Sequence, residues 1–195
     1  MIRFIYTFLL LLIFSIPNVG QEIVTHQKLL DQYKNYEATS IKNRRFKHAD
    51  IVPLIQKLKP PFKVQEIGKS IEGRSIYRVQ LGNGPTKVLL WSQMHGNEPT
   101  ATMALMDVFN FFSVSDQYDG FRQKLLEELT LVFIPMLNPD GAEQFERRNA
   151  LGVDLNRDAI RLQSPEAKLL KQQRDELDAD WGFNLHDQSR YYSAG

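Results

Sequence analysis

Two residue types that bind transition metals lie three positions apart in the segment His95-Gly96-Asn97-Glu98. The segment follows the apolar run Val88 to Trp91 and precedes Pro99, which predicts that it joins the end of a strand to the start of a helix. Imidazole nitrogen and carboxylate oxygen are the usual ligands of catalytic zinc, which takes three protein ligands and leaves a fourth position to water. His95 and Glu98 are therefore candidate zinc ligands.

A third ligand is expected at the end of another strand. The segment Asn184-Leu185-His186-Asp187 ends the apolar stretch that begins at Trp181, and this makes His186 the candidate. A lone His-x-x-Glu pair is weak support for a metal site, and a lone histidine in a loop more often binds no metal. The three residues gain weight only together, and from what surrounds them.

Four further blocks accompany these residues in a fixed order. Gly68-Lys69-Ser70-Ile71-Glu72-Gly73-Arg74 lies upstream, and Asn138-Pro139-Asp140-Gly141, Arg147-Arg148-Asn149 and Asp154-Leu155-Asn156-Arg157 lie between Glu98 and His186. In order and spacing, the stretch from about Phe62 to His186 resembles the zinc carboxypeptidases of the carboxypeptidase A type. The resemblance implies a metallocarboxypeptidase that hydrolyses C-terminal peptide bonds, with the C-termini of peptides or proteins as substrates.

The resemblance also assigns roles. It implies one zinc ion per chain, held by His95, Glu98 and His186. It places Arg147 at the oxyanion of the reaction, with Arg148 as the neighbour that could take this role instead. Asn156 and Arg157 match the pair that binds the terminal carboxylate of the substrate. Asp154 would hold an arginine or a metal-bound histidine in place without binding the metal itself.

Three features depart from the family pattern. Asp158 and Asp187 stand where an asparagine and a serine or threonine are common, and added negative charge there could select basic substrates or simply mark a subgroup. The family's general-base glutamate and its loop tyrosine lie beyond the third zinc ligand, so neither is assigned in this chain. We therefore expect a C-terminally truncated fragment that is inactive as given.

Two other functions fit the same residues. A zinc amidohydrolase of the aspartoacylase-like deacylase type shares the His-x-x-Glu pair and the distant histidine, and uses arginines for a small acidic substrate. A non-catalytic module could keep the zinc and the carboxylate anchors without the base. The upstream block from Gly68 to Arg74, which resembles a hairpin of the zinc carboxypeptidases, favours the peptidase. The export signal predicted at residues 1–20 also favours it.

The elements that position these residues alternate between strand and helix. Strands are predicted at Phe62 to Ile67, Ile76 to Leu81, Lys87 to Trp91, Leu131 to Leu137 and Trp181 to Leu185, with helices at Ala49 to Leu58, Pro99 to Phe112, Phe121 to Leu129 and Ser164 to Asp178. This order predicts an α/β fold with a mixed, largely parallel sheet, helices on both faces and the last strands missing. Since ligands bind beyond the carboxyl ends of such strands, the candidate residues should meet at one edge.

The N-terminal residues and the composition indicate where the protein acts and which partners it has. Residues 1–20, with Arg3 before an apolar run, predict a signal peptide, so that a secreted or periplasmic catalytic domain would span residues 21–195; an uncleaved membrane anchor is the alternative. The chain has no cysteine, and its net charge of +1 favours neither nucleic acid nor stable membrane association after cleavage. The basic segment Lys42 to His48 is interpreted as a solvated surface stretch.

Overall fold

The computed structural model describes residues 26–187, and the predicted signal peptide, residues 1–20, lies outside the described residues. The chain divides into two compact units after Gln32. Helix α2 (His26–Asp31) is the described element of the first unit. The second unit begins with a 3-10 turn at Tyr33–Asn35 and contains all the candidate site residues. Within residues 26–187, none of the helices is both long and apolar enough to cross a membrane.

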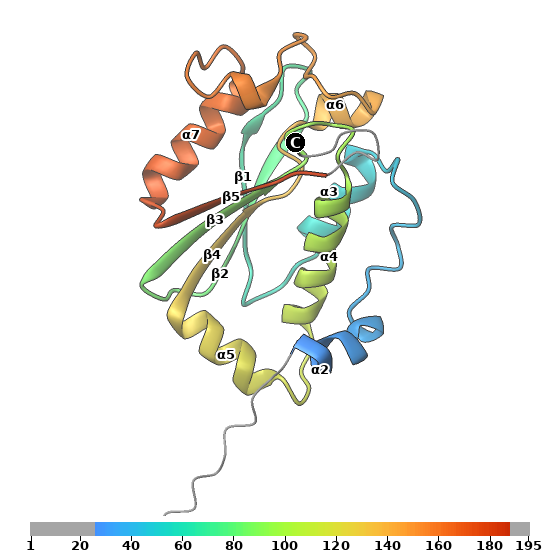
Figure 1. Ribbon diagram of the computed structural model, residues 1–195, viewed down its shortest axis with the longest axis vertical. Helices are drawn as coiled ribbons and strands as arrows, with labels where there is room; N and C mark the ends of the chain where they lie inside the picture. The colour runs from blue at the N-terminus through green and yellow to red at the C-terminus, as the bar shows by residue number, and fades with distance from the viewer. Residues whose placement is uncertain (1–25, 188–195) are drawn as a thin grey trace, which may run out of the picture. The chain divides into compact units, whose positions relative to one another are not determined.

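A five-stranded mixed sheet, in the order β1-β2-β4-β3-β5, forms the centre of the second unit (Figure 1). β1 (Lys63–Lys69) and β2 (Ser75–Leu81) form an antiparallel hairpin, and β2 is also antiparallel to β4 (Leu129–Ile134). β3 (Thr86–Ser92) lies parallel to β4 on one side and to β5 (Trp181–Leu185) on the other. The predicted α/β fold with a mixed sheet is confirmed, and its parallel part is β4-β3-β5.

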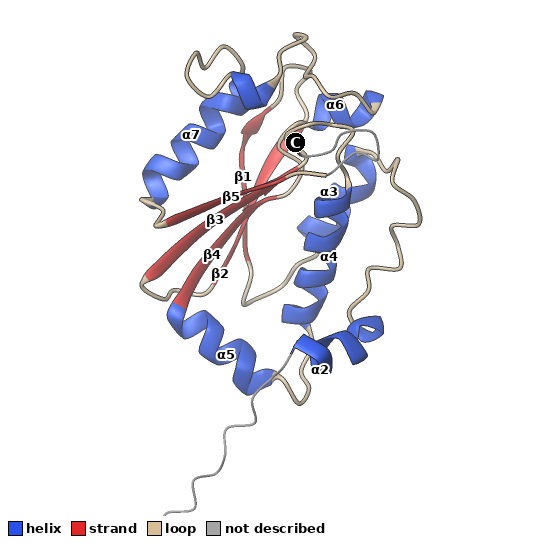
Figure 2. Cartoon of the chain, viewed as in Figure 1, coloured by secondary structure: helices blue, strands red, loops and turns tan. Residues whose placement is uncertain are grey.

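Helices cover both faces of the sheet, as the sequence predicted (Figure 2). One face packs against α3 (His48–Gln56) and α4 (Thr100–Ser113), and the opposite face packs against α7 (Pro165–Leu177). Helix α5 (Asp119–Glu128) leads into β4, and the short helix α6 (Pro139–Gln144) follows it.

The strands divide their side chains between two cores because successive residues of a strand point to opposite faces. In β2, Tyr77 and Val79 join the core under α3 and α4, whereas Ile76 joins the core under α7. In β4, Phe133 belongs to the first core, and Val132 and Ile134 belong to the second. The nearly continuous apolar sequence of β4 therefore reflects burial on both faces.

Strand β4 ends three residues earlier than predicted. The apolar sequence continues to Leu137, but Met136 has a positive φ of 61° and turns the chain out of the sheet after Ile134. Asn138 then caps α6, a short helix that the sequence analysis did not predict, by accepting a hydrogen bond from the Gly141 N–H at 2.9 Å. Hydrophobicity extended the predicted strand because Leu137 is buried as completely as the strand itself.

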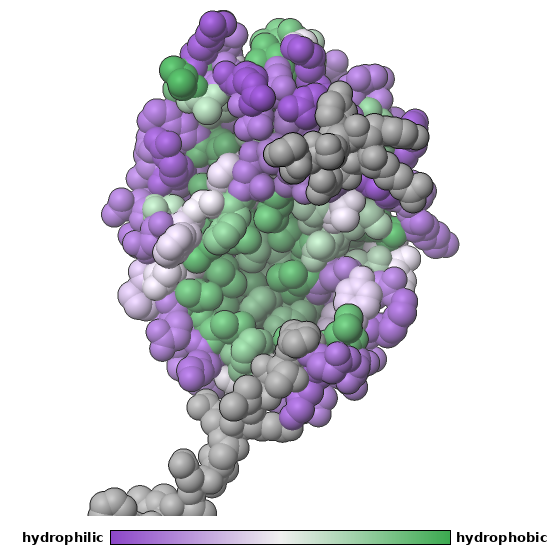
Figure 3. All heavy atoms as spheres, in the orientation of Figure 1, coloured by the Kyte–Doolittle hydropathy of each residue, from purple (hydrophilic) through white to green (hydrophobic). Residues whose placement is uncertain are grey.

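The edge strand β5 is less covered than the inner strands of the sheet. Within the described chain it pairs only with β3, and its residues Trp181 and Phe183 are 61% and 48% exposed. Figure 3 shows apolar side chains gathered on the side of the domain where β5 lies, between α7 and α4. The third candidate ligand thus follows an exposed edge strand.

We predict that Phe109→Ala lowers the free energy of unfolding by about 3–5 kcal/mol, the usual cost of removing a fully buried aromatic ring. Phe109 is 1% exposed and makes edge-to-face contacts with Phe62 and Phe133, at 5.7 and 5.3 Å between ring centroids. Urea denaturation of the purified variant measures the loss. Phe183→Ala is the matched control, and an equal loss there would contradict this assignment of the core.

Candidate metal centre

The parallel strands bring the candidate residues to one edge of the sheet. In β3 and β5, Ser92 pairs with Leu185, so the loop after β3 and the end of β5 leave the sheet at the same level. His95 and Glu98 lie in that loop, and His186 directly follows β5. The convergence expected at the carboxyl ends of the strands is therefore present in the structure.

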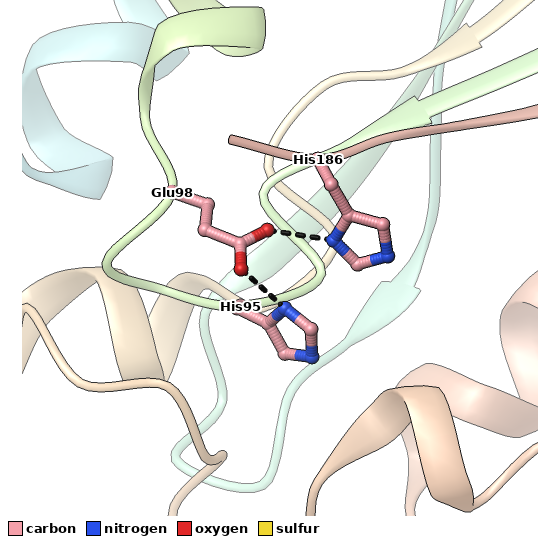
Figure 4. A group of neighbouring side chains, drawn as sticks. All are labelled: His95, Glu98 and His186. Atoms are coloured by element: carbon pink, nitrogen blue, oxygen red, sulfur yellow. Dashed lines mark hydrogen bonds and ion pairs between the residues drawn. The ribbon is translucent and has the colours of Figure 1, made fainter. Parts of the chain in front are cut away.

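The three side chains form a compact group (Figure 4). The Glu98 carboxylate lies between the two imidazoles, with Oε1 2.8 Å from His95 Nδ1 and Oε2 2.6 Å from His186 Nδ1. The two rings are stacked, with centroids 4.9 Å apart, and one ligand atom from each residue lies within 4.8 Å of the others. His95 is 1% exposed, so the group is closed on one side and open on the side of His186.

A fourth residue, Asp154, orients this group. Its Oδ1 lies 3.0 Å from His95 Nε2, and its Oδ2 accepts a hydrogen bond from Arg147 Nε at 3.1 Å and forms an ion pair with Arg147 Nη2, also at 3.1 Å. The Arg147 guanidinium is thereby held against the group, with Nη1 3.1 Å from His95 Nδ1 and 3.4 Å from Glu98 Oε1. Asp154 thus contacts both residues that the sequence suggested it would support.

The residues present fit a zinc ion. With a cation bound, a carboxylate at His95 Nε2 would hold the ring proton on that nitrogen and leave Nδ1 free to bind the metal. Nδ1 faces the oxygens of Glu98, and a cation bound between them would replace the hydrogen bond that they share in its absence. Two imidazoles and one carboxylate are also the donor set of many catalytic zinc sites.

The carboxylates of the group are held in their ionised form. Burial raises the pKa of Glu98, but hydrogen bonds from His95 and His186 outweigh it and lower the pKa below its ordinary value. Burial likewise raises the pKa of Asp154, and the His95 hydrogen bond and the Arg147 charge reverse the shift. Glu98 is therefore available as an anionic ligand at neutral pH.

Two glycines let the loop after β3 pack against the turn after β4. A Cβ atom on Gly96 would lie 1.9 Å from the carbonyl carbon of Gly141, so only glycine permits this approach. Asn138, fully buried, joins the same segments by donating from Nδ2 to the Met94 carbonyl at 3.3 Å and to the Arg147 carbonyl at 3.5 Å. The Asn-Pro-Asp-Gly block therefore fixes the backbone on either side of the metal group.

The upstream hairpin belongs to the same assembly. Asp140 is 2% exposed and accepts hydrogen bonds from Ser70 Oγ at 2.7 Å, the Glu72 N–H at 3.0 Å and Arg74 Nη1 at 2.7 Å. These donors lie in the turn between β1 and β2. The Gly-x-Ser-x-Glu-Gly-Arg block is thus the hydrogen-bonding partner of the Asn-Pro-Asp-Gly block and does not contact the metal group in the described chain.

The neighbouring arginines Arg147 and Arg148 have different partners. Arg147 faces the metal group, whereas Arg148 Nη1 donates to the Gly152 carbonyl at 2.8 Å and holds its own loop. Asn156 Nδ2 lies 3.5 Å from His186 Nε2. Arg157 is exposed, and within the described chain its guanidinium makes one hydrogen bond, from Nη1 to the Asn156 carbonyl at 3.1 Å. Most of its donors remain free for an anion.

The two extra aspartates have partners within the protein. Asp158 is 2% exposed and accepts hydrogen bonds from the N–H groups of Gln163 and Ser164 and from Ser164 Oγ, at 2.7–2.9 Å. Asp187 Oδ2 binds Arg44 Nη2 at 2.6 Å and Thr100 Oγ1 at 2.9 Å. Both carboxylates thus stabilise the fold, and a role in substrate selectivity stays a prediction.

A buried glutamate supports the arginine loop. Glu166 is fully buried at the start of α7, where its Oε2 accepts from Asn149 Nδ2 at 3.2 Å. The Asn149 Oδ1 in turn accepts from the N–H groups of Leu151 and Val153 at 3.1 and 3.0 Å, which shapes the loop leading to Asp154. From the sequence, Ser164-Pro165-Glu166 indicated only the start of a helix. An acidic residue in the first turn is already explained by its favourable interaction with the helix dipole.

Comparison with known proteins finds a family and related structures for this chain. The family model "Zinc carboxypeptidase" matches residues 51–182. Carboxypeptidase SOL1 of Arabidopsis thaliana is 30% identical over 102 residues, covering 49% of this chain and 21% of that protein. A solved metallo-carboxypeptidase from Pseudomonas aeruginosa is 28% identical with a TM-score of 0.62, covering 72% of this chain and 39% of the other. A solved metallo-carboxypeptidase from Burkholderia cenocepacia is 25% identical with a TM-score of 0.64, covering 72% and 40%.

The α/β fold and the His-Glu-His group define a domain built around a candidate metal site. The chain belongs to the zinc carboxypeptidase family. It spans about two fifths of the length of these solved relatives and about one fifth of the Arabidopsis protein. The resemblance inferred from the motifs is thereby confirmed at the level of the family.

We predict that Glu166→Gln changes the pH dependence of stability. Burial raises the pKa of Glu166 in the folded protein, so ionising it costs folding free energy as pH rises above its ordinary value of 4.5. Glutamine cannot ionise, and the variant should therefore gain stability relative to wild type as the pH rises above 4.5.

Urea denaturation across this pH range measures the effect. Replacing a carboxylate oxygen by an amide group also changes the free energy of unfolding by an amount that does not depend on pH. The prediction concerns only the part of the difference between variant and wild type that varies with pH. Glu127→Gln, at an exposed position of α5, is the control and should show no such trend. A difference between the Glu166 variant and wild type that stays flat with pH would refute the burial of an ionisable group there.

Proposed function

We propose that this protein binds one zinc ion per chain at His95, Glu98 and His186 and hydrolyses C-terminal peptide bonds of peptides or proteins. The observation that carries the proposal is the set of three ligand atoms within 4.8 Å of one another, beside an arginine held by Asp154. Membership of the zinc carboxypeptidase family supports the same metal and the same class of substrate.

When bound, zinc would polarise the scissile carbonyl and lower the pKa of a bound water. Arg147 supplies a fixed positive charge next to the ligand atoms, because Asp154 binds both its Nε and its Nη2. A fixed donor at a developing oxyanion is worth about 3–4 kcal/mol in other hydrolases. Asp154 also sets the His95 tautomer, so one carboxylate positions a metal ligand and the oxyanion donor together.

Substrate recognition falls to Asn156 and Arg157. Arg157 is exposed with most of its donors free, and a guanidinium binds a carboxylate through two parallel hydrogen bonds. Asn156 lies beside His186 and can hold the same group from the metal side. The related Pseudomonas aeruginosa enzyme was solved with (2-guanidinoethylmercapto)succinic acid, a ligand that carries carboxyl groups, which supports a carboxylate subsite.

Neither acidic residue of the group can serve as general base. Glu98 is shared between the two histidines, and Asp154 between His95 and Arg147. The base thus has to come from a residue other than these. Export of the protein is a further proposal, which rests on the sequence of residues 1–20 alone.

We predict that His95→Ala and His186→Ala each abolish stoichiometric zinc binding, because two remaining ligands do not make a stable zinc site. Elemental analysis of dialysed protein measures the metal content. His48→Ala is the matched control, since His48 Nε2 contacts the Ser75 carbonyl at 2.8 Å and takes no part in the group. Unchanged zinc in both site variants would refute the metal centre.

We predict that Arg157→Ala removes the preference for a free C-terminus. Zinc-loaded wild-type protein should bind a peptide with a free carboxylate more tightly than its amidated form, and the variant should bind both alike, a loss of about 10–100-fold for the free peptide, in line with a charge-assisted hydrogen bond of 1.5–3 kcal/mol. Isothermal titration calorimetry measures both affinities. Arg161→Ala, an exposed arginine four residues further on, is the control.

Assays on zinc-loaded protein distinguish the peptidase from the deacylase and from the binding module. Release of the C-terminal residue from blocked dipeptides supports the peptidase. Faster turnover of N-acyl amino acids would assign the deacylase reaction instead. Tight binding of free C-termini without turnover of either substrate would identify a binding module.

A further inference from the structure

The basic segment, residues 42–48, contacts the loops around the metal group although most of it is exposed. Phe46 is buried in the core under α3 and α4. The Arg45 guanidinium lies over the Phe145 ring at 4.5 Å, and Lys47 Nζ binds Glu143 Oε1 at 2.8 Å. Arg44 reaches furthest, to a residue 143 positions away. The segment is thus an exposed surface stretch before α3, as predicted, and its side chains also have specific partners within the protein.

Asp187, the partner of Arg44, directly follows the metal ligand His186. Its side chain is only 8% exposed, and Oδ2 accepts from Arg44 Nη2 at 2.6 Å, from the Thr100 N–H at 3.2 Å and from Thr100 Oγ1 at 2.9 Å. Its backbone N–H points to Glu98 Oε2 at 3.4 Å. Asp187 thus joins the end of β5 to the first residue of α4, two positions after Glu98.

His186 needs such an anchor more than the other two ligands. His95 and Glu98 lie between β3 and α4, which are both packed into the domain. His186 instead follows the exposed edge strand β5, which is bonded on one side only in the described part of the chain. A mostly buried carboxylate is stable when a cation pairs with it, and Arg44 supplies that cation.

We propose that Arg44 is a positioning residue of the metal centre: acting through Asp187, it holds His186 against Glu98. The inference rests on the proposed zinc site and deepens it. It assigns to the N-terminal basic segment a role in setting metal affinity. Residues that orient metal ligands from behind typically contribute about 10–100-fold to metal affinity.

The test compares zinc affinities of purified full-length variants by competition with a chromophoric chelator. Arg44→Ala should weaken zinc binding by about tenfold, at the lower end of that range because Arg44 itself is half-exposed. Arg44→Lys, which keeps the charge, should restore most of the affinity. Lys47→Ala is the matched control, since it removes an ion pair from the same segment without touching Asp187.

A double-mutant cycle then tests whether Arg44 acts through Asp187. In the Asp187→Asn background, Arg44→Ala should cause little further loss, because its partner carboxylate is gone. Fully additive losses, or an equal loss in Lys47→Ala, would overturn the proposal. Circular dichroism of each variant shows whether the fold is kept.

A readout without metal separates this inference from the zinc site itself. In the apo protein, the His186 ring resonances in 1H–15N NMR spectra should shift or broaden in Arg44→Ala and stay unchanged in Lys47→Ala, with His48 as internal reference. Absence of zinc in the wild type would defeat the proposed function, while the apo spectra would still decide whether Arg44 positions His186. Unchanged His186 signals in Arg44→Ala would refute the positioning role.

Discussion

The site depends on the close approach of two backbones, at Gly96 after β3 and Gly141 after β4. No side chain fits between them, since a Cβ atom on Gly96 would fall 1.9 Å from a backbone carbon. This contact sets the loop that carries His95 and Glu98 directly against the turn that begins at Asn138. The buried amide of Asn138 then reaches the carbonyl groups of Met94 and Arg147. The candidate ligands His95 and Glu98 and the neighbouring Arg147 are in this way built on one backbone assembly, the arrangement that a preorganised site requires.

Carboxylates supply most of the polar connections around this assembly. Asp140 holds the β1–β2 turn, Asp154 holds His95 and Arg147, Asp158 holds Ser164 at the start of α7, and Asp187 holds Arg44 and Thr100. Each is paired with cations or N–H and O–H donors, as largely buried charges must be. A net charge of +1 conceals this pattern, because the charges balance locally. Within the described chain, the Arg157 guanidinium therefore keeps most of its donors free, whereas these carboxylates are paired.

The weakest support lies under the third ligand. Strand β5 brings His186 to the correct edge, but Trp181 and Phe183 on it remain exposed and only β3 bonds to it in the described chain. The contact from the N-terminal basic segment to Asp187 compensates at the point where the strand ends. Metal affinity and the anchoring of β5 are coupled for this reason, and any change that loosens the end of β5 is expected to act on the metal first.

The sequence by itself determined the α/β class, the place of the strands, the family and the residues that meet at the carboxyl edge, because hydrophobic periodicity and short motifs are local properties. The tertiary structure alone decided how the motifs bind one another. Only there does the upstream hairpin pair with Asp140, Arg147 separate from Arg148, and Glu166 lie beneath Asn149. The partners of Asp187 and of the basic segment could not be predicted for the same reason. These partners lie 87 to 143 residues away, and the contacts of a charged side chain over such distances follow from the packing of the chain, which no local pattern encodes.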